Sequence, residues 1–157
     1  MKAINKLIEL NLLCWFSLIA GIKRGWASRQ DIINYAVSML NDKTDYDIIL
    51  IAGGEEYDDL ELKLRIKNYI NSQYPNNQKQ EELFQLAYEK WRLAHLLILS
   101  ENEFSFEQNL EQLQEIYAMF DYPEDMKSCS IYSQDEIDPI IAMGKVIDDL
   151  KIKFSIQ

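Results

Sequence analysis

The sequence predicts an all-α protein, a single-domain irregular helical bundle of about six to eight helices over residues 1–157. Three observations predict this class. Apolar residues recur at helical spacing through most of the chain, helix caps precede several of these stretches, and glycine and proline are scarce, with five and three residues. A chain of 157 residues has the length of one compact domain with one sizeable core.

The first part of the chain predicts two helices. Residues 12–23 are apolar on nearly all sides and end at Arg24 and Gly25, a cationic last turn followed by the residue best suited to a left-handed C-cap. We expect this helix near the centre of the core. Ser28 and Asp31 then form a capping box that starts an amphipathic helix. Its apolar residues at helical spacing are Ile32, Ile33, Ala36, Val37 and Leu40.

Residues 47–70 fit two interpretations. Alternate positions from Leu60 to Ile66 are apolar, which is a strand pattern, and residues 48–51 offer a second strand for a small β-hairpin at 47–66. A lone two-stranded hairpin is marginally stable, and the sequence shows no third strand. We favour helices over this stretch, with the hairpin as the alternative.

The second half of the chain predicts three more helices. A long one covers residues 80–100, and the last begins at Asp138, with proline's fixed φ at the first helical position. Between them, Ser105 and Gln108 form a capping box before the clearest amphipathic helix. Its stripe consists of Phe106, Leu110, Leu113, Tyr117 and Phe120. Residues 121–137 lack helical periodicity, and so long a loop in a compact domain is uncommon unless it is functional.

The net charge of −10 comes from one window of the chain. Residues 101–138 hold eleven acidic residues and one basic residue, whereas the rest of the chain has fifteen of each. Nucleic-acid and anionic-membrane surfaces need clustered Lys and Arg, which this sequence lacks. The charge therefore predicts neither nucleic acid nor membrane as a partner, and it indicates a protein with a basic surface.

Cysteine usage and the N-terminal run predict a cytoplasmic protein. Cys14 and Cys129 are too few for a disulfide framework. The apolar run before Lys23 is followed by two basic residues where a signal peptide would need small ones, and it is too short to span a bilayer. We interpret Cys14 as a small core residue, whereas Cys129, close to Lys127 in the loop, is a weakly supported candidate for a reactive thiol.

Motifs of catalysis are absent from the sequence. It contains no P-loop, G-x-G-x-x-G, G-x-S-x-G, H-E-x-x-H or EF-hand loop. The single histidine, His95, lies in an apolar helical stretch, which favours a structural, semi-buried imidazole, and no Glu stands three residues before it as in di-metal bundles. We predict no catalytic residue, no metal and no cofactor. A carboxylate-dependent metal-binding enzyme is the alternative.

The candidate partner-binding surface is the acidic helix and the loop after it. Glutamates at one-turn intervals fall on the side and back of this helix, and acidic residues continue into the loop. A tyrosine off the stripe adds a residue type that is favoured at interfaces. The simpler alternatives are a solvated acidic face and a tyrosine that covers the core. The predicted partner-binding residues are Glu107, Glu111, Glu115, Asp121, Tyr122, Glu124 and Asp125.

Residues 116–124, Ile-Tyr-Ala-Met-Phe-Asp-Tyr-Pro-Glu, resemble the motif I-Y-A-D-F-D-Y-P-E of an uncharacterised family of small bacterial helical proteins. A looser similarity includes Trp15, residues 21–26 and 31–36, and Lys-Trp-Arg at 90–92. The chain departs from the family at Met119, where Asp is usual, and after Met126.

Members of such families look like immunity proteins, which protect a bacterium from its own or a sibling's polymorphic or contact-dependent toxin. The resemblance implies an all-helical cytoplasmic protein that binds and blocks a cognate toxin domain, for example a nuclease with a basic cleft. It assigns no catalytic residue. We expect a monomer when the protein is free. A helical adaptor without a toxin connection is a further interpretation.

Overall fold

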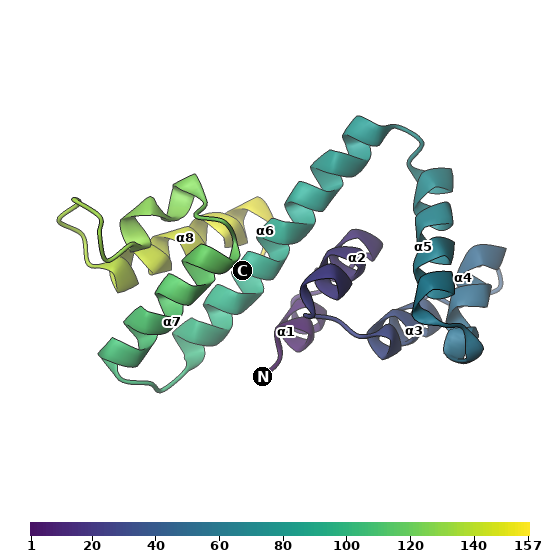
Figure 1. Ribbon diagram of the computed structural model, residues 1–157, viewed down its shortest axis with the longest axis horizontal. Coiled ribbons are helices and arrows are strands. Elements are labelled where there is room, and N and C mark those ends of the chain that lie inside the picture. Colours follow the sequence, from purple (N-terminus) through teal and green to yellow (C-terminus); the bar gives the residue numbers. More distant parts are fainter. The chain divides into compact units, whose positions relative to one another are not determined.

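The computed structural model describes residues 1–157 and contains eight α-helices, two 3₁₀ helices and no strand (Figure 1). The all-α prediction is confirmed. In chain order the elements are α1 (Ala3–Glu9), α2 (Trp15–Arg24), α3 (Arg29–Ser38), α4 (Tyr46–Ala52), η1 (Gly54–Glu56), α5 (Asp59–Gln73), α6 (Asn77–Glu101), α7 (Phe106–Met119), η2 (Glu124–Cys129) and α8 (Pro139–Lys153). None of the helices is long and apolar enough to cross a membrane.

The chain divides into two compact units. Unit 1 comprises Met1–Leu12 and Tyr88–Gln157, and unit 2 comprises Leu13–Ala87. Helix α6 contributes residues to both units. The sequence-based expectation of a single domain stays a prediction.

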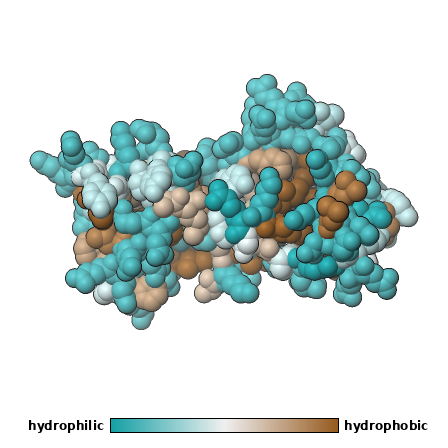
Figure 2. Space-filling model, viewed as in Figure 1, coloured by the Kyte–Doolittle hydropathy of each residue, from teal (hydrophilic) through white to brown (hydrophobic).

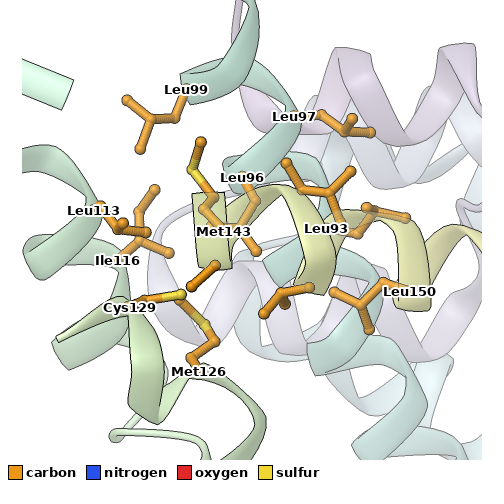
Figure 3. Packing of buried hydrophobic residues seen from close by; sticks show 13 residues of the cluster. Leu93, Leu96, Leu97, Leu99, Leu113, Ile116, Met126, Cys129, Met143 and Leu150 are labelled. Carbon is orange, nitrogen blue, oxygen red and sulfur yellow. The ribbon is translucent and has the colours of Figure 1, made fainter. Parts of the chain in front are cut away.

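Unit 1 has its core where the C-terminal part of α6 packs with α7, η2 and α8 (Figure 3). Leu93 and Leu96 of α6 and Leu113 of α7 are fully buried there. The residues of α8 that complete this core are Ala142, Met143, Val146, Ile147 and Leu150. Met143, Ile147 and Leu150 recur at helical spacing, and Phe154, which continues this series, packs against the same cluster.

The long loop between α7 and α8 is anchored in this core. It contains the 3₁₀ helix η2, so the expectation of irregular chain throughout 121–137 is wrong for Glu124–Cys129. Met126 and Cys129 are fully buried, and Figure 3 shows both side chains among those of α6, α7 and α8. Residues three apart eclipse each other in a 3₁₀ helix, so these two point the same way. One such turn is too short to show a period in the sequence.

The caps predicted for α7 and α8 are present. Ser105 Oγ accepts a hydrogen bond from the backbone N–H of Gln108 at 3.3 Å, and Gln108 Oε1 accepts one from the N–H of Ser105 at 3.2 Å. Asp138 caps α8 by accepting from the N–H of Ile140 at 2.7 Å. Of the stripe predicted for α7, Leu113 is buried, Leu110, Tyr117 and Phe120 are half-buried, and Phe106 is 55% exposed.

In unit 2, α2 is the buried helix that the sequence predicts. It ends at Gly25, whose φ of 76° is the expected left-handed cap. Its aromatic residues make edge-on contacts, Trp15 with Tyr35 and Phe16 with Phe84, each with ring centroids 4.9 Å apart. Ser17, also on α2, is fully buried.

In unit 2, α3 packs against α4, and α4 packs against α5. The capping box of α3 is present, with Ser28 Oγ accepting from the N–H of Asp31 and Asp31 accepting from the N–H of Ser28 at 2.7 Å. The stripe predicted for α3 is only partly buried. Val37 and Leu40, at its C-terminal end, are 51% and 45% exposed.

The ambiguous stretch 47–70 is helical, as favoured, and the hairpin alternative is wrong. Asp58 caps α5 by accepting from the N–H of Glu61 at 2.8 Å. The alternating leucines resemble a strand pattern because Leu60 and Leu64, which are exposed on the helix, alternate with buried residues. The buried face of α5 is instead the helical series Leu62, Ile66 and Ile70.

Helix α1 was not predicted. It buries Leu7 completely, and the ammonium of Lys6, itself 3% exposed, is 2.8 Å from a carboxylate oxygen of Glu101. A two-turn helix offers too few residues for a periodic pattern, and nothing in the sequence links Lys6 to a residue 95 positions away.

Candidate functional site

The three glutamates predicted to bind a partner lie together on an exposed side of α7. Glu107, Glu111 and Glu115 are exposed and form no ion pair. They line an open hollow of about 590 Å³, here called the α7 hollow. Its other lining residues are Leu110, Gln114, Ala118 and Ile131. The α7 hollow thus combines three carboxylates with an apolar surface.

Gln114 places the loop beside the α7 hollow. Its side-chain Nε2 donates to the backbone oxygen of Cys129 at 2.8 Å, and its Oε1 accepts from the backbone N–H of Ile131 at 3.2 Å. These bonds hold Ile131, which is 50% exposed, at the hollow. The sequence carries no signal for this tether, because the groups that Gln114 binds are backbone groups of the loop.

The end of α7 is an unusual turn that presents Tyr122. The N–H of Asp121 donates to Ala118 O at 3.0 Å and the N–H of Tyr122 to Tyr117 O at 2.9 Å, which is a Schellman motif without glycine. Asp121 and Tyr122 have φ of 60° and 55°, in the left-handed region that non-glycine residues rarely adopt. The pattern Asp-Tyr-Pro thus ends the helix through backbone geometry that glycine usually provides.

Tyr122 both contacts the stripe of α7 and is exposed. Its ring meets that of Tyr117 edge-on, with centroids 5.1 Å apart, so it covers part of the helix stripe. It is nevertheless 62% exposed, which leaves much of the ring and its surroundings open to a partner. Asp121, beside it, is exposed as well.

The two loop carboxylates differ in their surroundings. Glu124 is almost fully exposed and lies 3.4 Å from the ammonium of Lys127. Asp125 lies 2.5 Å from a guanidinium nitrogen of Arg92, whose side chain is only 6% exposed. Asp125 therefore neutralises a cation that would otherwise be buried without a counter-charge.

The seven predicted residues do not form one continuous pocket. The structure brings the three glutamates of α7 into one hollow, whereas Asp125 lines a different one, with Ser128, Ile137 and Lys145 among its neighbours. The sequence-based prediction did not identify Arg92 as the partner of Asp125. A signal existed, because Arg92 stands between Trp91 and Leu93 in an apolar helix, where a charged side chain needs a partner.

Burial shifts the pKa of two potentially reactive side chains of unit 1, His95 and Cys129. Burial lowers the pKa of His95 to about 4, so its imidazole is neutral at neutral pH. Burial raises the pKa of the Cys129 thiol to about 11, which overturns the interpretation of this residue as a reactive thiol. No group of three or more His, Cys, Asp or Glu side chains is placed where it could hold a metal ion.

Comparison with known proteins gives one match. A family model described as "Uncharacterized protein conserved in bacteria (DUF2247)" matches residues 4–150. No curated protein and no solved structure matches the chain.

Proposed function

The chain belongs to this family of uncharacterised proteins conserved in bacteria, and we propose that it is an immunity protein. It binds a cognate toxin domain that has a basic surface, such as a nuclease, and neutralises it. The contact is made by the exposed side of α7 and the loop that follows. The observation that carries this proposal is the α7 hollow, in which three glutamates without counter-ions surround apolar residues.

The arrangement of charge supports a binding role. Glu107, Glu111 and Glu115 stand four residues apart, a spacing at which like charges cost a helix a few tenths of a kcal/mol per pair. No base of this helix relieves that repulsion, because α7 contains no Lys or Arg. A cationic partner would relieve it, and the negative field would increase the rate of association.

The apolar part of the α7 hollow supports a protein rather than a simple ion as the partner. The aliphatic stem of a lysine or arginine packs well on apolar surface while its charged head reaches a carboxylate. Leu110 and Ile131 provide such a surface beside the three glutamates. Tyr122, at the end of the same helix, provides an exposed aromatic ring of the type that often contributes strongly at interfaces.

The genetic test is co-expression with the product of the gene immediately upstream, because an immunity gene is expected directly downstream of its toxin gene. We expect the chain to rescue growth of cells that express this product and to co-purify with it. Failure of both would refute the proposal. Co-purification with a partner that does not impair growth would support a helical adaptor instead.

The surface test replaces the three glutamates with glutamine, in the variant Glu107→Gln/Glu111→Gln/Glu115→Gln. We expect the Kd for the toxin to rise by at least about tenfold at low salt and to depend less on salt, with unchanged helicity and unfolding midpoint. These side chains form no ion pair within the fold, so the unfolding midpoint should change little.

The matched control is Glu55→Gln/Glu56→Gln/Glu61→Gln, which removes the same charge from exposed positions of unit 2. It should leave the Kd unchanged. Equal weakening by both triple variants would show that net charge, and not the α7 surface, drives binding. Asp125 is unsuitable for this test, because its replacement leaves Arg92 without a counter-charge.

A further inference from the structure

Unit 2 contains a hollow that the proposed function does not use. It has a volume of about 340 Å³ and is lined by residues of α2, α3, α5 and the first turns of α6; we call it the α2–α5 hollow. Figure 2 shows apolar surface framed by hydrophilic side chains over unit 2, in the right half of the view. None of the lining residues belongs to the candidate partner-binding surface.

The wall of the α2–α5 hollow is aliphatic and aromatic. Its apolar residues are Ile19, Ile22, Ile32, Ile66, Ile70 and Phe84. Pockets for small molecules typically have volumes of about 300–1,000 Å³ and a mostly apolar lining with few polar groups. Size and lining therefore fit a small ligand with an alkyl chain better than a protein surface.

Three of the four polar residues that line the α2–α5 hollow are lysines. Lys23, Lys63 and Lys67 line it, are exposed, and form neither an ion pair nor a side-chain hydrogen bond. Lys63 and Lys67 are one turn apart on α5, where like charges repel. The only other polar lining residue is Gln80, so no carboxylate of the hollow balances the three ammonium groups.

Two other cations of this unit are already engaged. Arg29 pairs with Asp59 at 3.2 Å, and the guanidinium of Arg65 lies 4.5 Å from the centre of the Tyr57 ring. Uncompensated positive charge at the α2–α5 hollow is therefore a local feature and not a property of every base in unit 2. An anionic group at this place would gain three cationic neighbours and meet no carboxylate in the lining.

We propose that the α2–α5 hollow binds an aliphatic anion with a single alkyl chain, such as a fatty carboxylate. The chain lies against the isoleucines and Phe84, and the anionic head lies at Lys23, Lys63 and Lys67. Burial of the chain provides most of the affinity, and the ammonium groups select the anion. The proposal is independent of toxin binding, since it uses other residues and another ligand.

Isothermal titration calorimetry of the full chain tests it with three probes of equal chain length. We expect decanoate, below its micelle concentration, to bind at least about tenfold more tightly than decanol, and decyltrimethylammonium to bind more weakly than both. Acetate and inorganic phosphate, which lack the chain, should show no binding. Equal affinity for decanoate and decanol, or no binding of decanoate, would overturn the proposal.

Charge variants test the role of the lysines. Lys63→Gln/Lys67→Gln should weaken decanoate binding by about tenfold and leave decanol binding unchanged. The control Lys43→Gln/Lys145→Gln removes the same charge at exposed positions outside the hollow and should change neither. The same loss of decanoate affinity in both pairs would show a general charge effect and refute the assigned site.

Methyl NMR spectra of the unmodified chain locate the ligand without a core substitution. Decanoate should shift the methyl signals of Ile19 and Ile22, and leave those of Ile116 and Ile147 in unit 1 unchanged. The variant Ile22→Trp, which fills the hollow from a half-buried position, should abolish both the shifts and the calorimetric signal. Shifts confined to residues outside the hollow would overturn the proposal even if decanoate binds.

Discussion

Units 1 and 2 differ in charge and in what they expose. Unit 1 holds 15 acidic and 8 basic residues, whereas unit 2 holds 11 and 8, so seven of the ten excess negative charges belong to unit 1. In unit 1 the acidic residues concentrate on α7 and the loop after it. In unit 2 three unpaired lysines, Lys23, Lys63 and Lys67, line an apolar hollow instead. The partners that we propose for these two surfaces therefore carry opposite charges.

One loop of unit 1 and two helices of unit 2 place particular apolar side chains differently. The irregular loop of unit 1 buries Met126 and Cys129 completely, whereas the regular helices α3 and α5 of unit 2 leave Val37, Leu60 and Leu64 about half or more exposed. Regular secondary structure is therefore no guide to which segment stabilises the fold. In unit 1 the loop that carries the acidic residues is part of the core, and this fixes the position of the candidate surface.

The largest effect that follows from this contrast concerns Met126. Met126→Ala removes a fully buried side chain from the unit 1 core and should lower the free energy of unfolding by about 2–5 kcal/mol. Leu64→Ala, in a regular helix of unit 2 but 56% exposed, should change it by less than about 0.5 kcal/mol. Urea unfolding followed by circular dichroism measures both.

The contrast between loop and helix would fail if Leu64→Ala were as destabilising as Met126→Ala. That result would mean that the exposed leucine is covered in solution, for instance by self-association. Repeating the unfolding experiment at several protein concentrations distinguishes this case, because the stability of an associated state depends on concentration.

His95 gives unit 1 a second distinctive property, sensitivity to acid. Its folded-state pKa of about 4 lies below the ordinary value of 6.5, so between these values the unfolded chain binds a proton that the folded chain excludes. Stability should therefore fall as the pH decreases from about 6.5 towards 4. From pH 7 to pH 4.5 we expect the free energy of unfolding of the wild type to fall by about 2 kcal/mol more than that of His95→Gln, whose residue 95 does not titrate in this range. Carboxylates titrate in both proteins and cancel in the comparison. Identical pH profiles in urea unfolding would refute the buried, neutral imidazole.

The sequence predicted those parts of the fold whose signals are local. Capping residues such as Ser28, Ser105 and Asp138 start helices through contacts within three residues, and these three starts are present. The alternating leucines of α5 were less informative, because an exposed leucine and a buried one look alike in a sequence. Helix α1 depends on distant contacts, such as that between Lys6 and Glu101, which no local pattern encodes.

The candidate site shows the same limit. Glu107, Glu111 and Glu115 are exposed, as their position outside the stripe of α7 predicts, although Leu110 of the stripe lies in the same hollow. That Ile131 shares their hollow depends on Gln114, and the role of Asp125 depends on Arg92, 33 residues earlier in the chain. Spacing along one helix is available to sequence reasoning, whereas contacts between a helix and an irregular loop are not.

The smallest effects, of opposite sign in the two units, are expected at two glycines. Gly25 in unit 2 has a φ of 76°, and a Cβ there would meet nothing within 4 Å. Gly25→Ala forces alanine into the left-handed region and should therefore lower the free energy of unfolding by about 1 kcal/mol. Gly144 in unit 1 lies inside α8, where a Cβ also meets nothing within 4 Å, so Gly144→Ala should stabilise by about 0.5–1 kcal/mol. Both substitutions add the same methyl group into open space, so a difference between their unfolding midpoints reports backbone conformation alone. Equal shifts of the same sign would contradict the left-handed end of α2.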